Sequence, residues 1–150
     1  MSNEESNETP KLLSDRIDAR ALTVNIFYDA IETLKSGKIE GVSMGQDTQL
    51  VIYTTFGTVT GQLMEDEYEN DAQLNSAAMI HEIFMKVRNK QLISLEEEGV
   101  NRLVNDSGYI PIVNAQITPF GNPNNVHRLG YFLLYPDQIT GLTFGQYQQD

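Results

Sequence analysis

The chain has 150 residues, enough to bury a hydrophobic core as a single domain without covalent cross-links. Ten Lys and Arg residues stand against 21 Asp and Glu residues, which gives a net charge of −11 at pH 7. Binding to nucleic acid or to an anionic membrane needs a basic surface, and here the cations are scattered apart from one cluster at 86–90. The composition therefore disfavours both kinds of partner, and solubility is the simplest role for the acidity.

The sequence contains no cysteine, which excludes disulfides, thiolate zinc sites and cysteine nucleophiles. The first 20 residues are polar and acidic and lack the apolar run of a secretory signal. The apolar stretches elsewhere are far shorter than the ~20 residues that cross a bilayer. We therefore expect a soluble, cytoplasmic protein that makes no membrane contact.

The N-terminal part is predicted to be a tail followed by a helix. Residues 1–10 are acidic and polar, which is typical of a disordered segment. Over Lys11–Ser36, apolar residues recur at three- and four-residue steps, the spacing of one helical face. We expect a helix here with a break near Asp18-Ala19. A strand over Thr23–Tyr28 is the alternative, because that stretch is rich in β-branched and aromatic residues.

Two strands and a tight turn are predicted in the middle of the chain. Gln49–Thr55 and Thr58–Met64 consist largely of β-branched and aromatic residues, which favour strands. Gly57 is expected to supply the positive φ that a tight hairpin turn usually needs. Gly61, inside the second strand, indicates a bend or a bulge. A short strand is also expected upstream, at Ile39–Met44.

A helical region follows the acidic segment Glu65–Asp71. Apolar residues at helical spacing predict a helix from about residue 71 to Asn89. Ser94 and Glu97 have the spacing of a capping box, which predicts a separate short helix as far as Leu103.

The C-terminal part is predicted to consist of strands at Tyr109–Phe120, Arg128–Tyr135 and Gln138–Phe144, the last two separated by Pro136-Asp137. The strand Arg128–Tyr135 is apolar on both faces, with two tyrosines on one face and Phe132 on the other. Such a strand needs cover on both sides. The core supplies one cover, and a helix of this chain or a neighbouring subunit supplies the other.

Familiar catalytic and metal-binding patterns do not occur in the sequence. His81-Glu82 begins like a zinc-peptidase helix, but Met85 stands where the second histidine is needed. A site made of His81, Glu82 and His127 is the alternative, and ordinary histidines are strongly favoured over it. The carboxylates of residues 65–71 suit calcium or magnesium but lack the spacing of a calcium loop, so a solvated loop is favoured. We expect no metal, no cofactor and no catalysis.

Two segments resemble the sequence motifs of Sm-like proteins. The last strand pair is similar to the second motif of that family, in register, through Gly130, Phe132, Leu134, Ile139 and Leu142. The central hairpin resembles the first motif through Gly57, Gly61, Leu63, Asp66 and Asn70. The resemblance implies an α+β fold built on a small, strongly bent SH3-like β-barrel of about five strands, which in this family often assembles into rings. The chain adds an N-terminal helix and a helical insertion near residues 71–104, so residues 11–150 form one domain.

The resemblance is weaker where the family binds RNA, because its Arg-Gly pair is replaced by Tyr135-Pro136. We therefore expect a non-catalytic interaction or assembly module, homo-oligomeric or bound to a protein partner. A divergent Sm-like RNA-binding protein and a small-ligand-binding protein are the alternatives. The candidate binding residues are Tyr135 and Asp137, since a turn projects its side chains from a barrel rim, together with Asp66 and Asn70 of the first motif.

Overall fold

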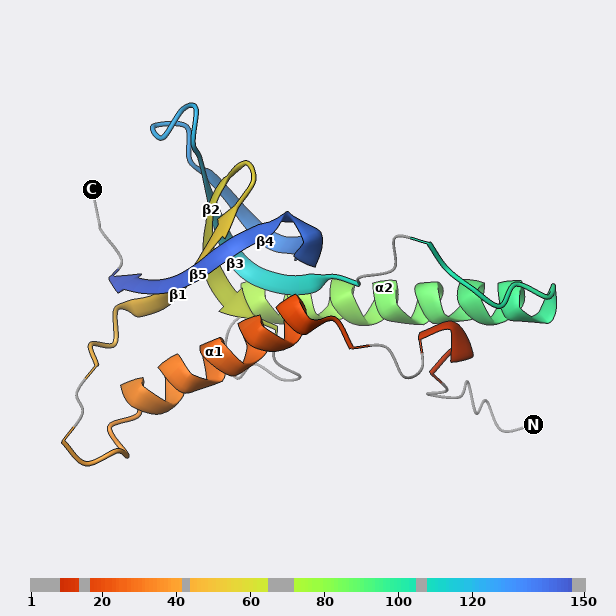
Figure 1. Cartoon of the computed structure of the whole chain (residues 1–150), viewed down its shortest axis with the longest axis horizontal. Coiled ribbons are helices and arrows are strands. Elements are labelled where there is room, and N and C mark those ends of the chain that lie inside the picture. Colours follow the sequence, from red (N-terminus) through yellow and green to blue (C-terminus); the bar gives the residue numbers. More distant parts are fainter. Residues whose placement is uncertain (1–8, 14–16, 42–43, 65–71, 105–107, 147–150) are drawn as a thin grey trace.

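A computed structural model gives the structure of residues 9–13, 17–41, 44–64, 72–104 and 108–146 (Figure 1). The predicted α+β class is confirmed, since two helices accompany one antiparallel sheet. The strands are β1 (Thr48–Thr54), β2 (Gly57–Leu63), β3 (Ile110–Pro119), β4 (His127–Leu134) and β5 (Ile139–Gln146). The hairpin and the three C-terminal strands therefore lie where the sequence predicts them, within one or two residues.

The strands pair in the order β4-β3-β2-β1-β5, and every pairing is antiparallel. Among the described residues, β4 and β5 each pair with one neighbour and form the two edges of an open sheet. The predicted closed barrel is therefore not confirmed. The expected strand at Ile39–Met44 is wrong for the described residues 39–41, which form a bend and a turn. Gly37 and Gly41 have positive φ angles, which are incompatible with an extended strand.

The sheet bends at a bulge between β2 and β3, as the sequence predicts for Gly61. Thr60 pairs with Gln116 and Gln62 pairs with Val113, so one residue of β2 faces two of β3. Gly61 has a φ of 156°, and a Cβ atom there would lie 2.5 Å from Cγ2 of Ile112. No larger residue fits this position without moving β3.

The turn between β1 and β2 uses glycine for a different reason from the one predicted. Gly57 does not have a positive φ. A Cβ atom there would instead lie 2.3 Å from the carbonyl oxygen of Thr118 on β3. The buried Thr54 hydroxyl builds the turn, because it accepts hydrogen bonds from the Phe56 and Gly57 amides at 3.3 and 3.1 Å and donates to the Gly57 carbonyl at 2.7 Å.

Helix α1 (Ala19–Lys35) covers one face of the sheet. Its N-cap is Asp18, whose carboxylate accepts a hydrogen bond from the Ala21 amide at 2.9 Å, so the predicted break is confirmed and the strand alternative is wrong. A short 3-10 turn, η1 (Lys11–Leu13), precedes it. The main core lies between α1 and the sheet and includes Val24, Ile31, Leu50, Ile52, Val59, Ile112 and Leu134.

Helix α2 (Ala72–Glu97) is one continuous element of 26 residues, so the predicted break and the capping box at Ser94 are wrong. The stretch 89–94 contains neither Gly nor Pro, and nothing there interrupts the backbone hydrogen bonds. The helix ends at Gly99, which has a φ of 95° and donates to the Glu96 carbonyl at 3.0 Å, while the Val100 amide donates to the Leu95 carbonyl at 3.0 Å. This pair of bonds is a Schellman motif.

We expect Gly57→Ala to destabilise the protein by about 1–3 kcal/mol, because the added methyl group is forced against the backbone of β3. Urea unfolding measures the loss. The matched control is Gly141→Ala on β5, where the new Cβ lies at an ordinary 4.0 Å from the Tyr53 Cβ. Equal stability of the two variants would contradict the close approach at Gly57.

Candidate functional site

The turn that the sequence singles out lies between β4 and β5. Tyr135 is 60% exposed, and Asp137 is exposed on the 3-10 turn η2 (Pro136–Gln138) that follows it. Arg20 of α1 anchors this turn, because its Nη1 atom donates hydrogen bonds to the carbonyl oxygens of Asp137 at 3.1 Å and Pro136 at 3.4 Å. The two candidate side chains are thus presented on a fixed backbone.

The hairpin turn and η2 lie at the same end of the sheet and are joined by Gln138. The Thr55 amide donates to the Gln138 carbonyl at 3.0 Å, and the Thr55 hydroxyl donates to the Gln138 amide oxygen at 2.6 Å. The other two candidate residues, Asp66 and Asn70, lie outside the described residues, as does the whole acidic segment 65–71. Their binding role stays a prediction.

Helix α2 of this chain packs on part of the outer face of the sheet, against β3 and β4. Along β4, Phe132 packs against the main core, and its neighbour Tyr131 points the opposite way, to α2. The Tyr131 hydroxyl lies 2.6 Å from Nδ1 of His81, and the two rings meet edge to face at 5.7 Å. The predicted two-sided strand therefore has a helix on one side and the core on the other.

A second tyrosine, Tyr109, fixes α2 one turn further along. Nη1 of Arg88 donates to its hydroxyl at 2.5 Å, and that hydroxyl donates to the Met85 sulfur at 2.7 Å. The Phe84 ring packs edge to face on the tyrosine ring at 5.4 Å, and the Arg88 guanidinium lies 5.5 Å from the ring centroid. Together with the His81–Tyr131 pair, these contacts form the helix–sheet junction.

Burial sets the protonation of this junction. It lowers the pKa of His81, and the nearby Arg88 guanidinium lowers that pKa further. Burial raises the pKa of Tyr109, and Arg88 opposes part of that rise. Burial also raises the pKa of Tyr131, with a smaller contribution from Tyr109. At neutral pH the junction is therefore a neutral histidine and two protonated tyrosines beside one arginine.

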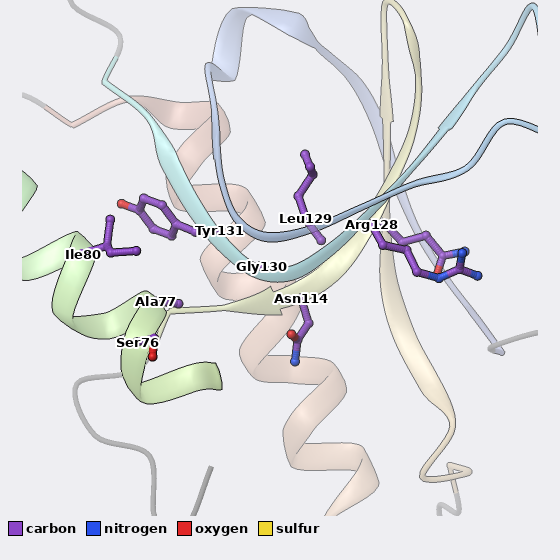
Figure 2. Close-up of a pocket in the computed structure, with 10 residues that line it drawn as sticks. Ser76, Ala77, Ile80, Asn114, Arg128, Leu129, Gly130 and Tyr131 are labelled. Atoms are coloured by element: carbon purple, nitrogen blue, oxygen red, sulfur yellow. The ribbon is translucent and has the colours of Figure 1, made fainter. Parts of the chain in front are cut away.

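A groove of about 850 Å³ opens beside this junction, where the sheet bends (Figure 2). Ala77 and Gly130 line it with small residues, and Figure 2 shows Ile80 on α2 beside the ring of Tyr131. Asn114 also lines it and has a φ of 50°, which places it at the bulge opposite Gly61. The groove is therefore a product of the bend. Its volume lies in the range of small-molecule sites.

The two edges of the sheet carry few of the residues that normally protect an edge. Natural edges are blunted by charges, prolines or bulges that prevent another strand from pairing there. One bulge interrupts β5 near its start, where Thr140 is the extra residue between the partners of Tyr53 and Thr54. Otherwise β5, ITGLTFGQ, contains neither a charged residue nor a proline, and Arg128 is the single Lys or Arg of β4. Leu129 on β4 and Phe144 on β5 are exposed.

Two kinds of site are not found in the described part of the chain. No group of three His, Asp or Glu side chains there gathers closely enough to hold a metal ion, so His81 and His127 do not meet at such a centre. Of the described helices, neither has the length and apolar character needed to span a bilayer.

The sequence did not reveal the helix–sheet junction. Its residues come from positions 81–88 and from Tyr109 and Tyr131, and only the sheet register brings the two tyrosines under the helix. The available signal was the pair of apolar faces on the predicted strand Arg128–Tyr135, which predicts a cover without identifying it.

Comparison with known proteins gives no relative: the chain matches no protein-family model, no curated protein and no solved structure. Its function is therefore inferred from the sheet edges, the groove and the surfaces of the two helices.

We expect stability to fall as the pH drops below about 6.5, in part through His81. Its folded pKa lies below the ordinary value of 6.5, so the unfolded chain binds the proton more readily and acid favours unfolding. This contribution is fully present above pH 6.5 and is lost as the pH falls.

Urea unfolding of His81→Gln between pH 7.5 and 5 tests this, because the variant should lose less stability than the wild type over that range. The matched control is His127→Gln, which removes an exposed histidine at the start of β4. Parallel curves for His81→Gln and the wild type would show that His81 carries no part of the pH dependence.

Proposed function

We propose that this protein is a non-catalytic assembly module whose copies join head to tail, the edge strand β4 of one copy pairing with β5 of the next. The open sheet with two poorly protected edges carries the proposal. An unpaired edge offers a row of N–H and C=O groups that another strand can satisfy, and the pairing buries exposed apolar side chains such as Leu129 and Phe144.

The two edges suit each other in length and in charge. Each strand has eight residues. Because β5 carries no charge, Arg128 of β4 meets no like charge on its partner. A contact between two different surfaces of one chain is heterologous, so it generates a ring where the rotation closes and a filament where it does not.

Within this proposal the sheet is the opened form of a small SH3-like barrel of the Sm-like kind. Three features support it: β5 pairs with β1 of the hairpin, an N-terminal helix covers one face, and the bulge at Gly61 bends the sheet. Fold likeness alone does not carry RNA binding.

RNA binding is the less favoured function. At the turn of Tyr135 and Asp137, the Arg20 guanidinium is occupied by hydrogen bonds to the backbone carbonyls of Pro136 and Asp137. A net charge of −11 adds long-range repulsion of phosphates. Protein contacts are therefore proposed in preference to RNA contacts.

Lysine substitutions at the edges test the assembly. We expect light scattering to give wild-type species larger than a dimer, and Leu129→Lys on β4 and Thr140→Lys on β5 to reduce their mass, since a lysine at an edge opposes pairing. Thr33→Lys, on the exposed side of α1, is the matched control and should leave the mass unchanged. A monomeric wild type at high concentration would overturn the proposal.

Mixing the two edge variants gives a sharper test, because each retains the edge that the other has lost. Tagged Leu129→Lys should retain untagged Thr140→Lys in a pull-down well above the amount of untagged Leu129→Lys that it retains. Equal retention in both mixtures would exclude head-to-tail pairing of β4 with β5.

A further inference from the structure

We infer that the head-to-tail pairing proposed above is antiparallel and that one cross-strand contact sets its register, between Leu129 of one copy and Phe144 of the next. This register rests on the proposed assembly and deepens it, since it identifies the residues that select the partner strand and its direction.

Each edge strand exposes one large apolar side chain among its described residues. Leu129 of β4 is 38% exposed, and Phe144 of β5 is 54% exposed. The Phe144 ring packs on Phe27 of α1, with the ring centroids 6.5 Å apart, but more than half of its surface remains open to solvent. A strand that pairs with either edge brings its own side chains beside this exposed apolar surface and covers it.

The two side chains project from the same face of the sheet. Leu129 lies directly opposite Ala115 of β3, and Figure 2 shows its side chain pointing away from Asn114. Phe144 lies directly opposite Leu50 of β1. Ala115 and Leu50 both belong to the main core, and residues directly opposite each other share a face. When β4 of one copy extends the sheet of the next through β5, Leu129 and Phe144 therefore lie on one face of the joined sheet.

The bulge explains why Leu129 does not share a face with Tyr131, although simple alternation would place residues two apart on one side. Asn114 has a φ of 50° and reverses the alternation of β3, so that Val113 and Ala115 project from opposite faces. Strand β4 pairs with both of these residues without a shift in register and follows the reversal. Tyr131 is therefore directed to α2, whereas Leu129 is free to meet another strand on the core face.

Face and chemistry select this register over its neighbours. A slip by one residue would place Leu129 and Phe144 on opposite faces of the joined sheet. A slip by two residues would place either His127 or Tyr131 opposite Phe144 in an antiparallel pair. His127 is polar, and the hydrogen bond to His81 holds Tyr131 on the other face. Only the unslipped register gives Phe144 an apolar partner on its own face, and aromatic–aliphatic pairs stabilise neighbouring strands.

The direction of pairing decides which residues flank this contact. Every pairing within the sheet is antiparallel, and antiparallel pairs are slightly more stable per residue than parallel ones. In the antiparallel pair, Arg128 of one copy lies opposite Gly145 of the next, which has no side chain to obstruct it. In a parallel pair with the same central contact, Arg128 would lie beside Thr143 instead. These two neighbours of Phe144 therefore distinguish the two directions.

The absence of cysteine makes the register directly testable, because two introduced thiols are the only ones present. Opposite residues of an antiparallel pair have Cα atoms about 4.5–5.5 Å apart, within the roughly 7 Å that a disulfide tolerates. A residue two positions along lies about 8.5 Å away. We expect Arg128→Cys mixed with Gly145→Cys, each carrying a tag of different length, to form a mixed disulfide on mild oxidation roughly ten times faster than Arg128→Cys mixed with Thr143→Cys.

Substitutions at Phe144 test the contact itself. Phe144→Ala in the Gly145→Cys chain should slow the mixed cross-link roughly threefold or more, and Phe144→Leu should restore most of the rate, because an apolar partner for Leu129 is regained. The matched control is Phe120→Ala in the same chain, since Phe120 is 57% exposed but lies after the end of β3, away from both edges. An added Cβ at Gly145 meets Cγ2 of Val51 at an ordinary 3.7 Å, so the cysteine there is compatible with the fold.

An equal or faster cross-link of Arg128→Cys with Thr143→Cys would overturn the antiparallel register. Equal rates for Phe144→Ala and Phe120→Ala would also overturn it, because the side chain at 144 would then play no part. If either result is found while the lysine variants at the edges still reduce the mass of the wild-type species, the head-to-tail assembly stands and the register alone is wrong. A monomeric wild type overturns both.

Discussion

The structure depends on the close approach of β2 and β3 at Gly61. A side chain at this position would strike Ile112 and the backbone of β3, so the bulge exists only because the residue has no Cβ. The extra residue on β3 turns Asn114 out of the ladder and Ala115 into the core. The bend that results curves the sheet and forms one wall of the groove beside α2, which Asn114 lines.

The two helices are attached to the sheet by different kinds of interaction. Helix α1 is held by aliphatic packing, since Val24 and Ile31 are almost fully buried in the main core. Helix α2 buries Ala77, contacts the sheet through the hydrogen bonds and rings of Tyr109 and Tyr131, and meets η1, where the Leu12 amide donates to the Glu96 carboxylate at 2.6 Å. None of the described side chains of α2 belongs to the main core, so this helix belongs to the less stable part of the fold, where local opening costs less free energy.

Local patterns predicted most of the sheet and failed where tertiary structure decides. The β-branched and aromatic residues predicted the positions of the five strands, and Gly61 inside the second strand predicted the bulge there. The strand at Ile39–Met44 failed because Gly37 and Gly41 turn the chain, and the break in α2 failed because Ser94 and Glu97 can occupy a helix interior as well as a cap. The sequence predicted a glycine turn at Gly57 but not its cause, since the backbone of Thr118, which excludes a side chain, lies 61 residues further along the chain. The turn after Tyr135 could be predicted from the local sequence, because Pro136-Asp137 separates two strands. The helix–sheet junction could not be predicted in this way, because it depends on the pairing register of β3 and β4.

The place of α2 in the chain has a consequence for how the protein folds. Strands β2 and β3 are neighbours in the sheet, yet all 26 residues of the helix lie between them in sequence. The β1–β2 hairpin closes a loop of two residues and can form early, whereas joining β3 to it means closing a far longer loop, at a greater entropic cost. Formation of the helix shortens that path, because a helix spans about 1.5 Å per residue where an extended chain spans more than twice as much. Early helix formation therefore brings the two halves of the sheet within reach of each other, and mutations that weaken α2 should slow folding of the sheet even at helix positions that do not contact it.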